Sequence, residues 1–332
     1  MTAIAAWLEG LRRVRRGPAL VAGVWLLTIA VAVPPSLALR ASITDHLGAS
    51  LEADAAADHV NWIWMQEFNA SSEPLARTLR PDVIGFAPVV DNASALADAA
   101  TPPAVVVIAG TVYLLLLTFL SGGLIDRLAR NRPLESYGFF AACGGLWFRM
   151  LRLYAVSAVF YGAVFASLHP WLFDSVFRSL TRDTTVERTA FFVRAGLYLV
   201  LSAVIAACSL VFDFAKVRLV VEDRRSVLAS IASAIRFIRR NPGAAIGVYA
   251  TNVATFLGVL AVYAAVAPGA GGAGWSMWGA FVVSQAFIAA RVAVKLAFWA
   301  SEAALFQSRL AHAGFVRRPL ACWPDPAAIT AS

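Results

Sequence analysis

The sequence has few charged residues for its length. Only 14% of its 332 residues are Asp, Glu, Lys or Arg, whereas 60% are hydrophobic and the mean hydropathy is +0.70. Soluble domains carry about 25% charged residues, and a single water-soluble core stops growing at about this chain length. The scarcity of charge therefore excludes an ordinary soluble domain and points to a lipid environment.

Cysteines and catalytic signatures are also scarce. The three cysteines, Cys143, Cys208 and Cys322, form no CxxC pair, so they offer neither a disulfide framework nor a zinc-binding spacing. The sequence contains no HExxH, no P-loop and no GxSxG elbow, which are the signatures of common hydrolases and nucleotide-binding proteins. We expect no cofactor, and the absence of these motifs favours a non-enzymatic protein.

What the sequence does contain is six long apolar stretches, each close to the length of about 20 residues that a helix needs to cross a bilayer. Strands of a β-barrel would be shorter and would alternate in polarity. The sequence predicts an all-α polytopic transmembrane helical bundle, with short amphipathic cytoplasmic helices and an outer segment of about 60 residues. We treat residues 1–332 as one membrane domain. The predicted spans are residues 18–39, 104–125, 153–173, 190–212, 243–267 and 275–299.

Basic residues set the predicted orientation. Segments 1–17, 126–152, 213–242 and 300–332 hold nineteen Lys and Arg residues, whereas segments 40–103, 174–189 and 268–274, together with Arg194 near the outer end of the fourth span, hold seven. The positive-inside rule therefore predicts cytoplasmic N- and C-termini. The first span also resembles a signal peptide, but its length and flanks favour retention. Nucleic acid is not an expected partner, because the basic residues flank apolar runs.

Amphipathic segments flank the predicted spans. In segment 1–17, Ile4, Trp7, Leu8 and Leu11 share one helical face; such a segment either binds anionic headgroups or serves only as a topology signal. Segments 126–152 and 213–242 both run from a basic elbow through a predicted helix to a basic exit, which suggests a duplicated helical hairpin. We expect the outer segment to form short helices that lie against the ends of the spans.

The last span carries two cations where hydrocarbon would surround them. Arg291 and Lys295 share a helical face, and Asp126 and Asp213, at the inner ends of spans two and four, are their natural partners. Charges within a bilayer are costly and face the bundle interior or a wet cavity. These four residues are the predicted binding site, for an anion or a lipid headgroup. The competing interpretation is that the cations snorkel or pair structurally and fix how the helix docks.

Spans two to six, with their basic elbows and two motifs of the outer segment, resemble a group of uncharacterised bacterial inner-membrane proteins. The motifs are Trp64-x-x-Glu67-Phe68 and Pro81-x-x-x-Gly85-Phe86. The six-span plan is also similar to the membrane-domain type attached to some glycerophosphodiester phosphodiesterases. This resemblance implies a bacterial cytoplasmic membrane and no activity, and no phosphodiesterase catalytic domain is visible in the sequence.

Three functions follow from these features. The first is transport or handling of an amphiphilic or anionic molecule in the inner leaflet, with the bilayer and anionic phospholipid headgroups as partners. The second is an assembly or scaffold subunit that holds another membrane or cytoplasmic protein. The third is an intramembrane enzyme, which would need a metal at His59 and its acidic neighbours Asp54, Asp58 and Glu67.

Overall fold

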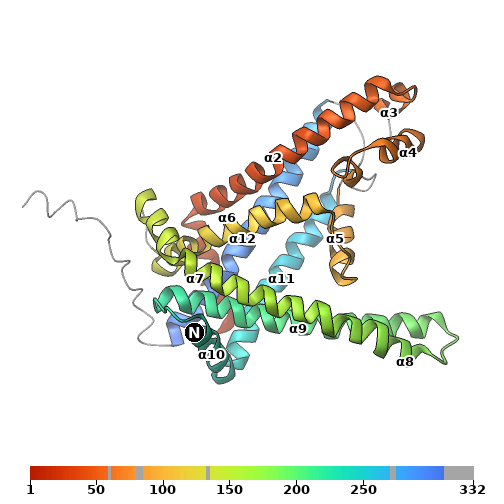
Figure 1. Cartoon of the computed structure of the whole chain (residues 1–332). Coiled ribbons are helices and arrows are strands. Elements are labelled where there is room, and N and C mark those ends of the chain that lie inside the picture. The colour runs from red at the N-terminus through yellow and green to blue at the C-terminus, as the bar shows by residue number, and fades with distance from the viewer. Residues whose placement is uncertain (59–60, 80–84, 132–134, 270–273, 310–332) are drawn as a thin grey trace, which may run out of the picture. The chain divides into compact units, whose positions relative to one another are not determined.

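The computed structural model describes residues 1–58, 61–79, 85–131, 135–269 and 274–309, and within these ranges every regular element is a helix (Figure 1). Six helices in this part of the chain are long and apolar enough to cross a membrane. They are α2 (Pro18–Ala49), α6 (Ala104–Arg130), the continuous run Ser136–Thr181, α9 (Glu187–Val221), α11 (Pro242–Val266) and α12 (Trp275–Arg309). The predicted all-α polytopic transmembrane bundle is confirmed.

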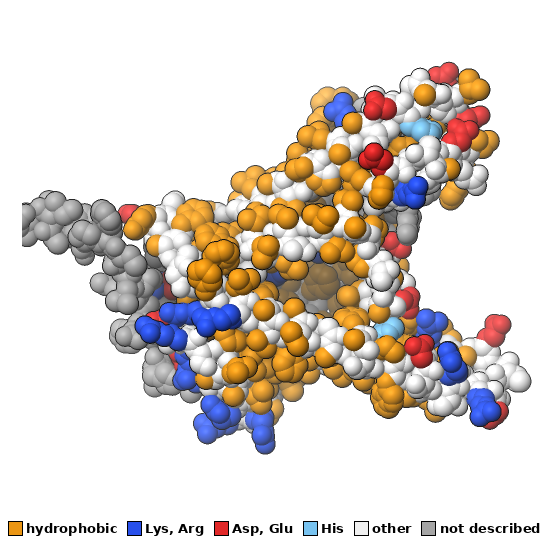
Figure 2. All heavy atoms as spheres, viewed as in Figure 1, with side chains coloured by type: hydrophobic (Ala, Val, Ile, Leu, Met, Phe, Trp, Pro, Cys, Tyr) orange, Lys and Arg blue, Asp and Glu red, His pale blue; other side chains and the backbone are white. Residues whose placement is uncertain are grey.

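The exposed surfaces of these helices are largely apolar, as in proteins embedded in a lipid bilayer. Figure 2 shows hydrophobic side chains along the lengths of the helices and charged side chains gathered toward their ends. Ile108 of α6, Leu199 of α9 and Val262 of α11 are each more than 60% exposed. Extended apolar surfaces of this kind mark contact with a membrane.

The chain forms two compact units, and α6, α11 and α12 each contribute residues to both. The first unit contains Met1–Pro18, Leu116–Asn252 and the chain from Lys295, and the second contains Ala19–Leu115 and Val253–Val294.

In the first unit α7 (Ser136–Ala163) lies beside α9, as Figure 1 shows. Its helix continues through π-helical turns at Val164–Leu168 and Trp171–Val176 into α8 (Phe177–Thr181). The predicted third span, residues 153–173, contains His169-Pro170 near its end, and the helix passes through this pair and continues to Thr181. Proline removes one backbone hydrogen bond and crowds the preceding turn, and the wider π turns on both sides accommodate it.

The segment after α6 differs from the prediction of a separate cytoplasmic helix. Residues from Ser136 onward form the first part of α7 rather than an independent helix. The corresponding segment after α9 does form a separate helix, α10 (Val227–Arg240). The two hairpins are therefore alike in their basic elbows but not in their connecting helices.

The elbow between α9 and α10 is built from local backbone and side-chain bonds. Asp223 adopts a left-handed conformation with φ of +49°, and the amide of Arg224 donates to the Leu219 carbonyl at 3.1 Å. This geometry satisfies the last carbonyls of a helix. The hydroxyl of Ser226 then caps α10 by accepting from the Ala229 amide at 3.3 Å.

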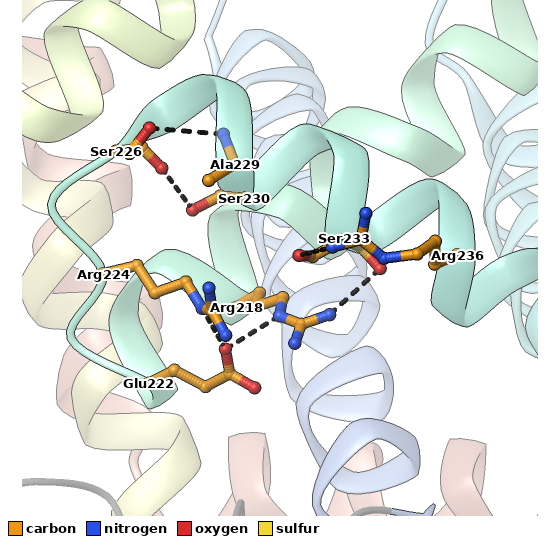
Figure 3. A network of polar contacts seen from close by, with 8 residues as sticks. All are labelled: Arg218, Glu222, Arg224, Ser226, Ala229, Ser230, Ser233 and Arg236. Carbon is orange, nitrogen blue, oxygen red and sulfur yellow. Dashed lines mark hydrogen bonds and ion pairs between the residues drawn. The ribbon is translucent and has the colours of Figure 1, made fainter.

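Charged side chains hold α10 against α9. Glu222 accepts hydrogen bonds from Arg218 and Arg224, and Arg218 also donates to the Ser233 carbonyl at 3.0 Å (Figure 3). Phe237 of α10 packs within the first unit and is buried. Because hydrogen bonds to charged groups each contribute roughly 1.5–3 kcal/mol, this network fixes the direction in which the chain leaves the elbow.

The N-terminal helix α1 (Ala3–Arg15) packs into the first unit through small side chains. Its buried residues are Ala6, Gly10 and Val14. A Cβ on Gly10 would lie only 2.7 Å from the backbone nitrogen of Ser301 on α12. Arg13 donates to the Leu128 carbonyl at 3.1 Å and to Gln307 Oε1 at 3.0 Å. The helix is therefore docked against α6 and α12 by close backbone approach and by one arginine.

In the second unit α2 continues ten residues past the predicted end of its span, through Pro34 and Pro35 to Ala49. Membrane helices tolerate proline, and the last turns of α2 are held by a small core. Trp64, Met65, Phe68 and Ala76 are buried in this core, and Leu39, Ile43 and Leu47 of α2 pack against it.

The other outer elements are α3 (Ala53–Asp58), α4 (Trp62–Ser71), a 3₁₀ turn (Ala76–Thr78) and α5 (Ala87–Ala97). The expected packing of short helices against the end of a span is thus confirmed for α4. A second contact in this unit joins the loop before α5 to α11, because the Tyr263 hydroxyl donates to the Gly85 carbonyl at 3.0 Å. Pro81, Arg132 and the tail from residue 310, which includes Cys322, lie outside the described residues.

Candidate functional site

The two aspartates of the predicted site form ion pairs within their own helices. Asp126 accepts from Arg130 Nε at 2.8 Å on α6, and Asp213 accepts from Lys216 Nζ at 2.7 Å on α9. Asp126 is 4% exposed, so its pairing with Arg130 compensates for the cost of burying its charge.

The two cations of the predicted site lie on the surface of α12. Arg291 and Lys295 are four residues apart on this continuous helix, and both side chains are exposed. The Arg291 guanidinium lies 5.7 Å from the Phe287 ring, and the Lys295 ammonium lies 5.7 Å from the Trp299 ring. Each cation therefore lies over an aromatic ring one turn away. The attraction between a cation and an aromatic ring is stronger where water does not solvate the charge.

A buried polar cluster that the sequence did not predict surrounds Lys216. Its ammonium contacts Asp213 and lies 4.9 Å from the Tyr154 ring of α7 and 5.9 Å from the Trp299 ring of α12. Trp299 is 2% exposed and therefore touches both the buried Lys216 and the surface Lys295. Three helices of the first unit, α7, α9 and α12, meet at this one ammonium group.

Glu302 of α12 extends this cluster and is its most unusual member. Its side chain is fully buried, and within the described part of the chain neither carboxylate oxygen has a hydrogen-bond partner. Asp213 and Lys216 are the charged groups within electrostatic reach of it. A buried polar group without a partner costs roughly 1–3 kcal/mol, and more when it is charged, so this carboxyl group calls for an explanation beyond packing.

A second buried polar contact joins α11 to α12 next to Glu302. The Asn252 amide donates to Ser301 Oγ at 2.7 Å and to the Val248 carbonyl at 3.0 Å. These two bonds fix which way the amide points, because a carbonyl can only accept. The Asn252 oxygen is consequently left buried, with no partner among the described residues.

The sequence predicts a cytoplasmic tail over residues 300–332, and the predicted site leaves Glu302 out although it lies seven residues beyond Lys295. Glu302 is the one acidic residue of α12, and this spacing puts it and Lys295 on one helical face. Lys216 also lies outside its predicted span, which ends at residue 212, because α9 continues to Val221.

The predicted alternative of a metal-dependent enzyme gains no site in the described part of the chain, where no three His, Cys, Asp or Glu side chains group around one point. His59 lies outside the described residues. His46 instead packs edge-on against Trp64 and Phe68, with ring centroids 5.8 and 5.3 Å away.

The fold and these sites define the class of protein: an all-α polytopic transmembrane bundle with a buried charge cluster in its first unit. No family model matches the chain, and no curated protein or solved structure matches it.

Proposed function

We propose that this protein binds an anionic amphiphile, such as a phospholipid, through Arg291 and Lys295 on the surface of α12. The observation that carries the proposal is that both cations are exposed, one turn apart, on a helix long and apolar enough to span a membrane. Two exposed cations one turn apart attract the negatively charged headgroup of a lipid, and such a headgroup lowers the cost of placing positive charge next to hydrocarbon.

The depth of the two cations fits a headgroup. Arg291 is sixteen residues after Trp275, where α12 begins, which corresponds to about 24 Å at 1.5 Å per residue. Lys295 follows at about 30 Å, the thickness of the hydrocarbon. A phosphate at the inner boundary of the bilayer would lie within reach of both side chains, while acyl chains cover the apolar surface of α12.

The exposed surface of the N-terminal helix α1 supports the same position for the inner boundary of the bilayer. Its small residues are buried, so Ile4 and Leu8 remain exposed together with Arg12, Arg15 and Arg16. A helix with apolar and basic residues on its free surface lies in the plane of a membrane interface and attracts anionic lipids. Because α1 packs on Ser301, this interface lies near the end of α12 that carries Lys295.

In this proposal the membrane is a bacterial cytoplasmic membrane and both termini face the cytoplasm. The uneven distribution of Lys and Arg between the two sets of connecting segments supports this orientation. The proposed function is to handle the bound amphiphile, by holding or by moving it.

The test measures how strongly anionic lipid is preferred over zwitterionic lipid by protein in nanodiscs of mixed phosphatidylglycerol and phosphatidylcholine. Each Lys or Arg near a membrane surface contributes about 1 kcal/mol to the binding of anionic lipid. Arg291→Gln and Lys295→Gln should therefore each weaken the preference about fivefold, and the double variant about 25-fold.

Arg188→Gln is the matched control. Arg188 is also exposed and lies 5.7 Å from an aromatic ring, that of Phe192 four residues later, but at the opposite end of α9 from the buried cluster. It should leave the lipid preference unchanged. A folded double variant that keeps the wild-type preference would contradict the proposed function.

A further inference from the structure

The carboxyl group of Glu302 is buried where no hydrogen-bond donor reaches it. Its exposure is 0%, and both oxygens lack partners in the part of the chain that the structure describes. The one cation within its reach, Lys216, is already bound to Asp213 at 2.7 Å. Two carboxyl groups therefore share one ammonium group, and one negative charge is left without compensation.

The groups packed around Glu302 do not supply that compensation. Its own helix contributes Lys295, whose ammonium lies 5.7 Å from the Trp299 ring. Helix α11 contributes Tyr249 and helix α7 contributes Tyr154 against Lys216, whereas Phe237 of α10 packs on Phe306 of α12. Helix α1 packs on the neighbouring Ser301. The charged groups that act on Glu302 are Asp213 and Lys216, which pair with each other. On the neighbouring helices α1 and α9, Glu9 pairs with Arg13 and Arg218 pairs with Glu222.

An isolated ionised carboxylate is expensive to bury, and such a group becomes neutral instead. A metal cation is a poor substitute here, because the Lys216 ammonium would repel it and because the described residues form no metal-binding group. A proton needs only one oxygen and adds no volume. It also converts Glu302 into a hydrogen-bond donor beside an ionised aspartate.

We infer that Glu302 is a proton-binding site and that its proton controls the binding of an anion at Lys295. The coupling rests on the proposed function. A proton from water binds one carboxylate oxygen, forming an O–H bond and removing one negative charge; no other bond changes. Glu302 and Lys295 lie seven residues apart on one face of α12, about 10 Å along the axis.

Trp299 connects the two sites. Its ring lies 5.9 Å from the Lys216 ammonium inside the cluster and 5.7 Å from the Lys295 ammonium at the surface. When Glu302 is ionised, its charge repels an anion held at Lys295 and draws Lys216 away from the ring. At about 10 Å and an effective dielectric constant of about 20, the repulsion alone weakens anion binding about tenfold.

The proton is observed by infrared difference spectroscopy of the protein in phosphatidylcholine nanodiscs, through the carbonyl stretch of a protonated carboxylic acid. The chain has 20 Asp and Glu residues that all give this band when protonated, so the band of Glu302 is the difference between the wild-type and Glu302→Gln spectra. This difference should contain the band at low pH and lose it as the pH rises, and Glu302→Asp should keep a titrating band relative to Glu302→Gln. Asp213→Asn, which alters the other carboxyl group, should shift the titration without removing it.

Three results would overturn the proton site. They are a wild-type spectrum equal to that of folded Glu302→Gln at every pH, a difference band that does not change with pH, and a difference band that responds to sodium replaced by choline at constant pH. The spectra need no anionic lipid, so the proton site is tested independently of the proposed function.

The coupling is tested by the preference for phosphatidylglycerol as a function of pH. Wild type should bind it about tenfold more tightly below the Glu302 titration than above it, whereas Glu302→Gln should bind tightly at both. A titrating band without any lipid preference would overturn the proposed function and the coupling but support the proton site. Equal pH dependence in wild type and Glu302→Gln would overturn the coupling alone.

Discussion

Replacing Gly10 by alanine is expected to loosen α1 from the end of α12. The new methyl group would lie 2.7 Å from Ser301 N, 2.8 Å from its Cβ and 2.9 Å from its Cα. Two of these atoms belong to the backbone and cannot move separately, so the helices must part by about 1 Å to reach ordinary contact. Overpacking of this kind costs about 1–3 kcal/mol.

Two further effects modify this estimate. Alanine favours a helix interior over glycine by about 0.5–1 kcal/mol, which offsets part of the clash. Parting the helices also stretches the bonds from Arg13 to Leu128 and Gln307, now 3.1 and 3.0 Å, and each bond from a charged donor contributes roughly 1.5–3 kcal/mol. The expected net destabilisation is about 1–3 kcal/mol.

Gly196→Ala is the matched control, because Gly196 lies within α9 and a Cβ there meets nothing within 4 Å. Thermal unfolding in a mild detergent, followed by circular dichroism, should show a lower midpoint for Gly10→Ala and an equal or higher one for Gly196→Ala. Hydrogen exchange should accelerate in α1 before other helices. Equal midpoints and equal exchange of α1 in the two variants would refute the docked N-terminal helix.

Three other substitutions test the packing by the same thermal measurement. Gly123→Ala places a methyl group against Cys143 Sγ and should destabilise by about 1–3 kcal/mol; adding Cys143→Ala should restore part of the loss, and no restoration would contradict the contact. Asn252→Ala and Ser301→Ala, whose side chains bond at 2.7 Å, should show a coupling of about 0.6–1.7 kcal/mol in a double-mutant cycle; strictly additive effects would argue against the bond. Gly85→Ala requires alanine at φ of +76° and should destabilise by about 1–2 kcal/mol, whereas Gly258→Ala, in open space, should not.

The sequence was sufficient for the class of fold because lipid imposes a strong constraint on composition. Six apolar stretches of adequate length were found, and all six are helices. Their ends were less predictable. Pro34, Pro35 and Pro170 were expected at or near helix ends, yet all three lie inside continuous helical runs. A proline stops a helix only where nothing else holds the next turn, and here α4 and α9 hold it.

The site was only partly predictable from the sequence. Arg291 and Lys295 were found because a cation within an apolar run is conspicuous, and their binding role stays a prediction. Glu302 was placed in a tail, because hydropathy falls where α12 leaves the predicted hydrocarbon layer. The helix continues to Arg309, and its part beyond residue 295 buries alanines 297, 300, 303 and 304 together with Leu296, Trp299, Leu305 and Phe306.

The orientation of α1 shows why periodicity must be interpreted differently in a membrane protein. The apolar face of this helix predicts contact with a core in a soluble protein. Here Ile4 and Leu8 are exposed, whereas Ala6 and Gly10 are buried. Large apolar side chains gain nothing by leaving lipid, whereas small ones let two backbones approach closely.

Small residues also mark the contact at the end of α12, where Gly10 packs against Ser301 and several alanines are buried. A periodic stripe of small residues is therefore the better predictor of protein contact in this chain, and an acidic residue within such a stripe is predicted to be buried. Glu302 lies in the stripe of α12, next to Ser301. By this rule its burial follows from the small residues around it, and Trp299, Leu305 and Phe306 in the same stretch of α12 are buried as well.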